Sequence, residues 1–226
     1  MVATDLQKEA PSFTADATGS GEIVYRRLDV SRPEDWSSLG AWLGSEHGRV
    51  DGLVNNAGIP FRTRLEEVTL MDWDRVLAVN LTGPLLGIQT FAPLMGAGGS
   101  IVNISSVAGL TGHFAAAYTV SKWGLRGLSR VASLELGPRG IRVNTICPGY
   151  IETAMTASVA DAFRIANIAE VPLGRVGTVD EVAALVVYLI SDESSYVSGA
   201  EIPVDGGQSG HGGTKSLSDA VRAATP

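Results

Sequence analysis

The chain lacks several features that mark secreted, metal-binding or membrane-spanning proteins. A single cysteine, Cys147, excludes an intrachain disulfide and is typical of a reducing compartment. The three histidines are isolated in the sequence, and no metal-ligand spacing is present. No run of 18 apolar residues occurs, and the first residues lack the basic-then-apolar pattern of a secretion signal. These absences predict a cytoplasmic protein that holds no metal and spans no membrane.

Positive charge is also scarce. The chain has 17 lysines and arginines against 24 aspartates and glutamates, which gives a net charge of −7. This surplus of negative charge argues against binding to nucleic acid or to an anionic membrane surface. Hydrophobic residues make up 45% of the 226 residues, as expected for a folded domain with a large core. We therefore expect one globular domain whose ligand is a small molecule.

Strands and helices alternate along the chain, which predicts an α/β fold with a doubly wound parallel sheet. The predicted strands cover residues 2–6, 22–28, 51–54, 100–104, 141–147 and 201–204. The predicted helices cover residues 33–47, 70–95 with a kink at 83–84, and 180–190, and a further helix contains Tyr118 and ends near residues 137–138. We expect a Rossmann-like domain over residues 1–207 and a polar surface tail over 208–226. Ligands of such folds bind at the carboxyl ends of the strands.

The most informative stretch is GSIVNISSVAGLTGHFAAAYTVSKWGLRG, residues 99–127. It is predicted to form a strand, a loop and a helix, with Tyr118 and Lys122 one turn apart on one helix face. A phenol normally titrates near ~10, and an adjacent ammonium lowers that pKa. The phenol can then exchange a proton with an alcohol or a carbonyl oxygen, while a serine hydroxyl holds the same oxygen. This chemistry suits alcohol–carbonyl interconversion in which a cofactor carries the hydride.

Further segments accompany this stretch in one order. LVNNAG occupies residues 53–58, VNLTG 79–83, NISS 103–106, YTVSK 118–122 and ICPGYIETAM 146–155. These motifs resemble the short-chain dehydrogenase/reductase family, and the likeness covers residues 2–207. The resemblance implies that Tyr118 is the catalytic acid/base and that Lys122 lowers its pKa and binds the nicotinamide ribose. It also implies that Ser106 orients the substrate carbonyl and that Asn80 holds a water in a proton relay.

The catalytic serine has two candidates. The family's usual serine-to-tyrosine separation is thirteen residues, which Ser105 matches, whereas Ser106 precedes Tyr118 by twelve. Ser106 is favoured because the second serine followed by V-A-G-L is the family's usual context. A loop shortened by one residue is also easier to accommodate than a strand slipped by one, which would turn every side chain to the other face. Ser105 stays an alternative.

The cofactor residues also follow from the resemblance. An acidic side chain that ends the second strand of a Rossmann fold binds the adenosine ribose and repels a 2′-phosphate. Asp5 is in that place, so the resemblance implies NAD and not NADP, although Asp5 also fits a solvated strand end. The remaining candidates would line the adenine, the cofactor path and the nicotinamide carboxamide: Asp29, Val30, Asn56, Ala57, Gly58, Tyr118, Lys122, Pro148, Gly149, Ile151 and Thr153.

The largest departure from the family is that the sequence contains no G-x-G-x-x-G turn. The family has about thirty further residues before the point where this sequence begins, which would supply the first strand, the glycine loop and the first helix. We therefore expect a fold that is incomplete at its N-terminus, with the first two strands unlinked to the strand at 51–54. A misplaced start, a degenerate paralogue and re-paired halves are the three explanations.

Substrate-facing positions are expected in residues 108–117 and 154–171, which are mostly small and apolar. They favour a hydrophobic, steroid-like secondary alcohol or ketone, and SKWGLRGLS and SDESSYVSGAE are similar to segments of bacterial hydroxysteroid dehydrogenases. The alternatives are a 3-oxoacyl carrier-protein reductase and a non-catalytic member that acts through assembly. The family usually forms tetramers, and the apolar segments 85–94 and 123–134 are candidate faces of a homotetramer.

Overall fold

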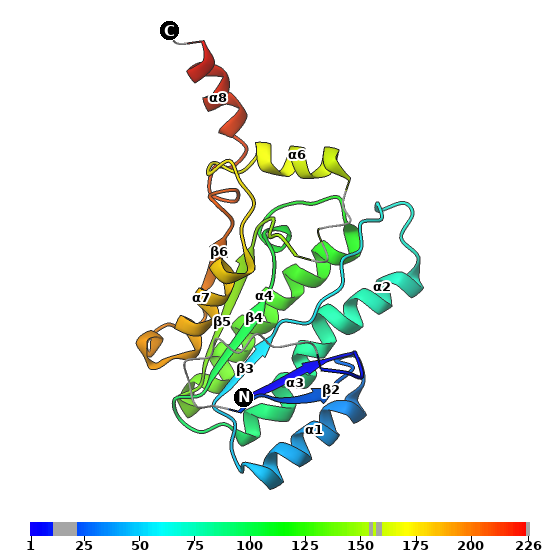
Figure 1. Ribbon diagram of the computed structural model, residues 1–226, viewed down its shortest axis with the longest axis vertical. Coiled ribbons are helices and arrows are strands. Elements are labelled where there is room, and N and C mark those ends of the chain that lie inside the picture. Colours follow the sequence, from blue (N-terminus) through cyan, green and yellow to red (C-terminus); the bar gives the residue numbers. More distant parts are fainter. Residues whose placement is uncertain (11–21, 154–155, 157–159, 225–226) are drawn as a thin grey trace.

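The computed structural model describes residues 1–10, 22–153, 156 and 160–224 (Figure 1). Its strands are β1 (Val2–Asp5), β2 (Val24–Arg27), β3 (Gly52–Asn55), β4 (Ser100–Ile104), β5 (Arg142–Pro148) and β6 (Glu201–Val204). Every strand pairing is parallel, and helices flank the strands. The predicted Rossmann-like α/β fold of a single domain is confirmed, and each predicted strand is present within about two residues of its expected bounds.

The strands form two separate sheets. One has four strands in the order β3-β4-β5-β6, and the other contains β1 and β2 alone. Within the described residues no strand pairs with both β1 and β3, which is the break that the Rossmann strand order leads us to expect. The predicted ligand-binding residues nevertheless lie at the carboxyl ends of five strands, β1 to β5.

One face of the strands packs on α1 (Pro33–Glu46), α3 (Gly83–Phe91) and α4 (Ala116–Leu136). Trp36 of α1 meets Phe91 of α3 edge to face with ring centroids 5.8 Å apart, and its indole N–H donates to the carbonyl of Val30 at 2.8 Å. Leu28, at the end of β2, is buried in the same cluster. These contacts attach the two-stranded sheet to the rest of the domain.

The opposite face of the four-stranded sheet packs on α7 (Val179–Ile190), where Val102, Ile146 and Leu189 are fully buried. The α7 N-terminus has the predicted cap: the Thr178 hydroxyl accepts from the backbone N–H of Glu181, and the Glu181 carboxylate accepts from that of Thr178. The two helical layers hold β4 and β5 between them.

The long helix predicted over residues 70–95 is α2 (Leu70–Leu77), a π-helical turn (Ala78–Thr82), α3 and a 3₁₀ turn (Ala92–Leu94). The irregularity expected at Gly83–Pro84 is a π-helical turn that ends directly before Gly83, whose N–H donates to the carbonyl of Ala78, and Pro84 lies in the first turn of α3. This is also the one helix among the described residues long and apolar enough to span a membrane. Its packing on the sheet through Val76, Ile88 and Phe91 is that of a core helix.

Two shorter helices lie in the C-terminal third of the chain. α6 (Asp161–Ala169) follows β5, and residues 154–155 and 157–159 before it lie outside the described part. The segment predicted as a polar surface tail contains α8 (Lys215–Ala223), which projects from the domain (Figure 1). Alanine, leucine and an i,i+4 ion pair between Lys215 and Asp219 favour helix there.

Candidate active site

Segments far apart in the sequence bring the four proposed catalytic residues to the carboxyl ends of β3 and β4. Asn80 comes from the π-helical turn and Ser106 is the second residue after β4, while Tyr118 and Lys122 lie in the first two turns of α4. The Lys122 ammonium donates to the carbonyl of Ile104, the last residue of β4, at 2.8 Å. The strand end and the helix are therefore joined by the lysine side chain itself.

Lys122 is a buried cation with only 4% of its surface exposed. Burial disfavours the charged form, and it lowers the pKa of Lys122 to about 8. Its Nζ lies 5.7 Å from the centroid of the Tyr118 ring, on the ring's face. A lysine held in this way is a functional candidate, since buried ammonium groups without a carboxylate partner are rare in folded proteins.

The two serines after β4 point to different neighbours. The Ser105 hydroxyl donates to the backbone carbonyl of Lys122 at 3.0 Å and is buried against α4. The Ser106 hydroxyl lies beside Tyr118 and favours the phenolate, and it also accepts from the N–H of Ala108 at 3.1 Å. The geometry therefore favours Ser106 over Ser105 as the serine that faces a substrate oxygen.

Gly109 allows the turn after Ser106 to approach α4. A Cβ at this position would lie 2.8 Å from the Ser105 Oγ and 3.0 Å from the Lys122 carbonyl oxygen, closer than real Cβ atoms approach. Arg126 of α4 donates from Nη1 to the carbonyl of Gly109 and from Nη2 to Glu201 of β6 at 2.6 Å. The arginine thus fixes the turn that carries Ser106 against the body of the domain.

Burial has the largest effect on Tyr118 and raises its pKa above the ordinary value for a phenol. Hydrogen bonding to Ser106 and the positive charge of Arg62 act in the opposite direction. Lys122 is not among the groups that shift this pKa, and its ammonium donates instead to the carbonyl of Ile104. Tyr118 is therefore protonated at neutral pH.

Asn80 is fully buried and holds the loop that follows β3. Its amide oxygen accepts from the N–H of Ile59 at 2.8 Å, and its amide nitrogen donates to the Ile59 carbonyl and to the Ser121 hydroxyl, both at 3.1 Å. A Cβ on Gly58 would come within 3.5 Å of both the Asn80 amide oxygen and the Lys122 Nζ. Asn80 therefore positions the 56–58 segment beside Lys122, whatever water it also holds.

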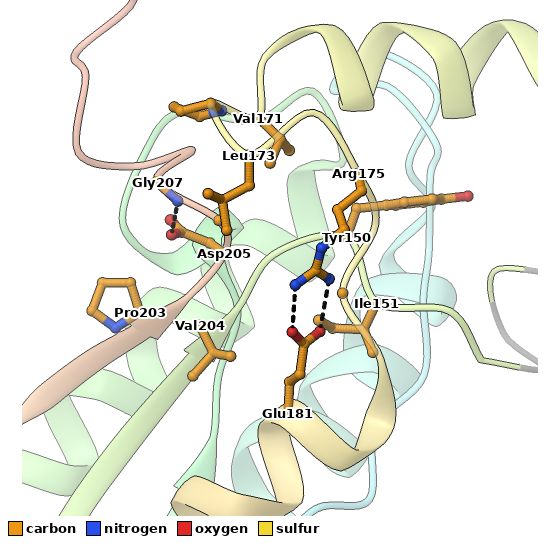
Figure 2. Close-up of a pocket in the computed structure, with 13 residues that line it drawn as sticks. Tyr150, Ile151, Val171, Leu173, Arg175, Glu181, Pro203, Val204, Asp205 and Gly207 are labelled. Carbon is orange, nitrogen blue, oxygen red and sulfur yellow. Dashed lines mark hydrogen bonds and ion pairs between the residues drawn. The ribbon is translucent and has the colours of Figure 1, made fainter.

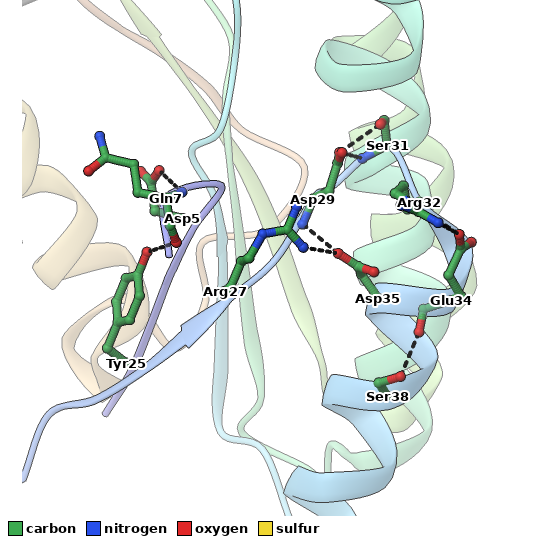
Figure 3. Close-up of polar contacts among 10 residues, drawn as sticks. All are labelled: Asp5, Gln7, Tyr25, Arg27, Asp29, Ser31, Arg32, Glu34, Asp35 and Ser38. Atoms are coloured by element: carbon green, nitrogen blue, oxygen red, sulfur yellow. Dashed lines mark hydrogen bonds and ion pairs between the residues drawn. The ribbon is translucent and has the colours of Figure 1, made fainter. Parts of the chain in front are cut away.

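The predicted adenosine-binding residues lie on the smaller sheet (Figure 3). The Asp5 carboxylate, exposed at the end of β1, accepts from the Gln7 N–H at 3.1 Å. The Asp29 carboxylate accepts from the N–H and hydroxyl of Ser31, and these bonds hold the Asp29 pKa below its ordinary value. Both side chains accept hydrogen bonds through their carboxylate oxygens.

The other cofactor candidates follow β2, β3 and β5: Val30, Asn56, Ala57, Gly58, Pro148, Gly149, Ile151 and Thr153. A Cβ on Gly149 would lie 2.8 Å from Asp205, so only glycine fits there. These residues and the two aspartates suit the nicotinamide and adenosine ends of a dinucleotide. The sequence contains no G-x-G-x-x-G turn, so these candidates account for the two ends of a dinucleotide and none of them is assigned to its pyrophosphate.

A cavity of about 540 Å³ lies beyond the ends of β5 and β6 (Figure 2). Tyr150, Ile151 and Gly177 line one wall, and Arg175 forms a two-bonded ion pair with Glu181 across it. None of the four proposed catalytic residues lines this cavity. It shares Ile151 with the predicted cofactor residues.

Sequence reasoning missed three basic residues at the site. Arg62 and Arg64 lie in the loop between β3 and α2, and Arg126 pairs with a carboxylate 75 residues away. The signal for the first two is a pair of arginines directly after the LVNNAG segment. No local pattern pairs Arg126 with Glu201, because their contact depends on how α4 packs over β6.

A tyrosine, a serine and a buried lysine at the carboxyl edge of a parallel α/β sheet define a site of the dehydrogenase type. Comparison with known proteins agrees. The profile of a family described as Enoyl-(Acyl carrier protein) reductase matches residues 1–209. A trans-4-hydroxycyclohexanecarboxylate dehydrogenase of Sinomonas cyclohexanicum is 42% identical over 195 residues, which are 84% of this chain and 73% of that protein.

Two further relatives cover similar spans. A 3-alpha-(or 20-beta)-hydroxysteroid dehydrogenase of Mycobacterium bovis is 44% identical over 205 residues, 89% of this chain and 76% of the relative. A 3-oxoacyl-[acyl-carrier-protein] reductase of Thermotoga maritima is 39% identical over 212 residues, 92% and 86% of the two chains. The chain belongs to the short-chain dehydrogenase/reductase family and is an oxidoreductase of the CH–OH type.

Proposed function

We propose that the chain is an NAD-dependent oxidoreductase that interconverts a hydrophobic secondary alcohol and a ketone. The observation that carries the proposal is the meeting of Ser106, Tyr118 and Lys122 beside the Gly58 segment that Asn80 holds. A bound nicotinamide would accept the hydride from the alcohol carbon or return it to the ketone. The protein side chains supply the proton chemistry.

In ketone reduction the protonated Tyr118 donates its proton to the carbonyl oxygen, and the Ser106 hydroxyl holds that oxygen beside it. In alcohol oxidation the same phenol must first lose its proton, and it then accepts the proton of the substrate hydroxyl. Because burial raises the pKa of Tyr118, we expect oxidation to accelerate as pH rises and reduction to be favoured near neutral pH. Lys122 lies with its Nζ over the Tyr118 ring and donates to the end of β4, so it positions α4 and its tyrosine for this transfer.

The preference for NAD rests on Asp5. Its exposed carboxylate at the end of β1 suits the 2′-hydroxyl of an adenosine ribose and would repel a 2′-phosphate. Tyr118, Lys122, Ile151 and Thr153 would hold the nicotinamide end.

The substrate is proposed to be a cyclic or steroid-like alcohol. Aromatic side chains from three segments meet after the carboxyl ends of β4 and β5, namely Phe114, Tyr150 and Phe163. Two relatives are named for ring alcohols, a hydroxysteroid and a hydroxycyclohexanecarboxylate. The second candidate is a 3-oxoacyl carrier-protein reductase, which the relative from Thermotoga maritima favours.

We also propose a cytoplasmic homotetramer that binds neither nucleic acid nor membrane. The exposed apolar side chains of α3 and α4 support assembly through these helices: Leu85, Trp123, Val131 and Leu134. Sedimentation equilibrium tests this, and a monomer would contradict it. A tetramer that fails to bind NAD(H) would instead favour the non-catalytic member that acts through assembly.

The deciding experiment is NAD(H) binding by this chain, measured by calorimetry, followed by oxidation of cyclohexanol with NAD⁺. Tyr118→Phe is expected to lower turnover by at least about 10²-fold and to leave NAD(H) binding intact. Tyr196→Phe, at a fully exposed tyrosine, is the matched control and should keep full activity. Absence of NAD(H) binding, or activity that survives Tyr118→Phe, would contradict the proposal.

A further inference from the structure

Two arginines reach the aromatic side chains at the mouth of the site from the loop between β3 and α2. The guanidinium carbon of Arg62 lies 5.6 Å from the centroid of the Phe163 ring, and that of Arg64 lies 5.5 Å from the Phe114 ring. Phe114 comes from the loop before α4 and Phe163 from α6, and their ring centroids are 6.3 Å apart. The two cations therefore stand side by side over one aromatic surface.

This arginine–aromatic cluster consists of Arg62, Arg64, His113, Phe114, Tyr150 and Phe163. His113 stacks on Phe114 with ring centroids 4.5 Å apart, and Tyr150 meets Phe163 at 6.1 Å. Its members come from the segments that follow β3, β4 and β5 and from α6. The cluster thus stands at the carboxyl edge of the sheet, where a substrate of Tyr118 must enter.

The cluster is electrostatically coupled to the catalytic tyrosine. The charge of Arg62 acts on Tyr118, where it favours the phenolate, and on His113, whose pKa it lowers together with burial. Arg62 is thus within electrostatic reach of the reacting hydroxyl. An anion held by Arg62 would lie near the substrate oxygen without touching it.

Among the described residues, neither arginine side chain forms an ion pair or a hydrogen bond, although seven other arginines pair with carboxylates. The chain is acidic overall, so unpaired cations at the site mouth are unexpected. A planar guanidinium resting on an aromatic ring is well placed to form two parallel hydrogen bonds with a carboxylate.

We propose that Arg62 and Arg64 form a carboxylate-binding subsite, so that the preferred substrate is an apolar alcohol or ketone with a carboxylate remote from the reacting carbon. This deepens the proposed function and rests on it. The aromatic rings hold the hydrocarbon between the carboxylate and Tyr118. A neutral steroid alcohol leaves both arginines unpaired and is therefore a poorer substrate.

Binding of cyclohexanecarboxylate and of the neutral cyclohexanecarboxamide tests the subsite without any reaction. We expect the chain, titrated in calorimetry with and without NAD⁺, to bind the carboxylate at least about tenfold more tightly than the amide. Arg62→Gln should remove most of this preference, Arg64→Gln part of it, and neither should change amide binding. Arg49→Gln, which removes the same charge at the amino end of β3, is the matched control and should change nothing.

Equal affinities for carboxylate and amide, no detectable binding of either, or a preference that survives the Arg62→Gln, Arg64→Gln double variant would each overturn the subsite. Inorganic phosphate should compete at least tenfold more weakly than cyclohexanecarboxylate. Equal competition would make this a general anion site and would also overturn the assignment. Both arginines are exposed, so the variants should melt at the wild-type temperature.

Measurements of turnover test the carboxylate subsite and the proposed oxidoreductase function separately. We expect kcat/KM for 4-hydroxycyclohexanecarboxylate to exceed that for its methyl ester by at least tenfold, and the ratio to approach one in Arg62→Gln. Equal turnover of acid and ester would keep the proposed function and reject the subsite. Carboxylate binding that depends on Arg62, with no oxidation of any alcohol, would keep the subsite and reject the proposed function.

Discussion

Strands β4 and β5 are covered on both faces, whereas β1 and β2 are half exposed. Every residue of β4 is buried except Ile104, and only Pro148 of β5 is less than buried. In β1 and β2 the last two residues of each strand are exposed. The half of the domain that carries Tyr118 and Lys122 is therefore far better packed than the half that carries Asp5 and Asp29.

The difference indicates that the two halves differ in local stability. A sheet of two short strands is marginal in water without further packing. Here the pair is held mainly through Leu28 and through Trp36, which links α1 to α3. We infer that the adenosine-binding half opens locally while the catalytic half stays folded.

The largest expected change in stability comes from removing the contacts that hold β1 and β2 to the rest of the domain. Trp36→Ala should cost about 3–5 kcal/mol, because it removes a buried aromatic ring that also satisfies the Val30 carbonyl. Hydrogen exchange should show lost protection in β1, β2 and α1, with β4 and β5 still protected. Trp123→Ala, at a half-exposed tryptophan, is the matched control and should cost about 1 kcal/mol or less. Uniform loss of protection across both sheets would show that the domain unfolds as one unit.

On the catalytic side, Arg126→Met should cost roughly 3 kcal/mol, since it leaves the buried Glu201 carboxylate with one partner. It should also release the Gly109 carbonyl and speed amide exchange in the turn after Ser106. Arg130 pairs with the same carboxylate but is 66% exposed, so Arg130→Met should cost less than about 1 kcal/mol. Similar costs for the two variants would contradict the structural role of Arg126.

Local patterns predicted most of the fold. Apolar alternation and helical periodicity located every strand and the long helices, because each element buries one side on the same core. The π-helical turn at Ala78–Thr82 was not predicted, since the adjacent Gly83–Pro84 pair carried the stronger local signal. The helix at Lys215–Ala223 was also missed, because the glycines at 206–213 made the whole segment resemble a tail.

The sequence predicted those site residues that lie in a family motif and also have side chains suited to proton transfer. Tyr118, Lys122 and Ser106 meet as their spacing indicates, while the position of Lys122 on the Ile104 carbonyl depends on how α4 packs on β4. The contacts of Arg62 with Phe163 join segments about a hundred residues apart, and no periodicity encodes them. Contacts of this kind require the assembled fold.

A change at the exposed adenosine end should have a smaller, purely local effect. Asp5→Asn removes the negative charge that would repel a 2′-phosphate and should shift the NAD-to-NADP preference roughly tenfold toward NADP. Calorimetric Kd values for both cofactors provide the measurement. Asp51→Asn, at the amino end of β3, should leave the ratio unchanged. A wild-type chain that already prefers NADP would refute the role given to Asp5.

The smallest expected effect is a pH dependence confined to the catalytic half. The pKa of Lys122 falls from its ordinary 10.5 to about 8 on folding, so above pH 8 the unfolded chain binds more protons than the folded one. Stability should therefore rise by about 1 kcal/mol between pH 8 and pH 9. Cys147 has the opposite effect on stability. Burial raises its pKa from 9.0 to about 11, so the folded state loses stability as pH rises from 9 to 11.

Urea unfolding at pH 8, 9 and 10 distinguishes these two groups. Lys122→Met should remove the gain between pH 8 and pH 9, whereas Cys147→Ala should keep that gain and extend the rise beyond pH 9. In the two-stranded sheet, the pKa of Tyr25 is raised above its ordinary value of 10.0, so Tyr25 changes the stability only above pH 10. A gain that persists in Lys122→Met would mean that the ammonium is not desolvated on folding, and the lysine would then be an ordinary solvated cation beside Tyr118.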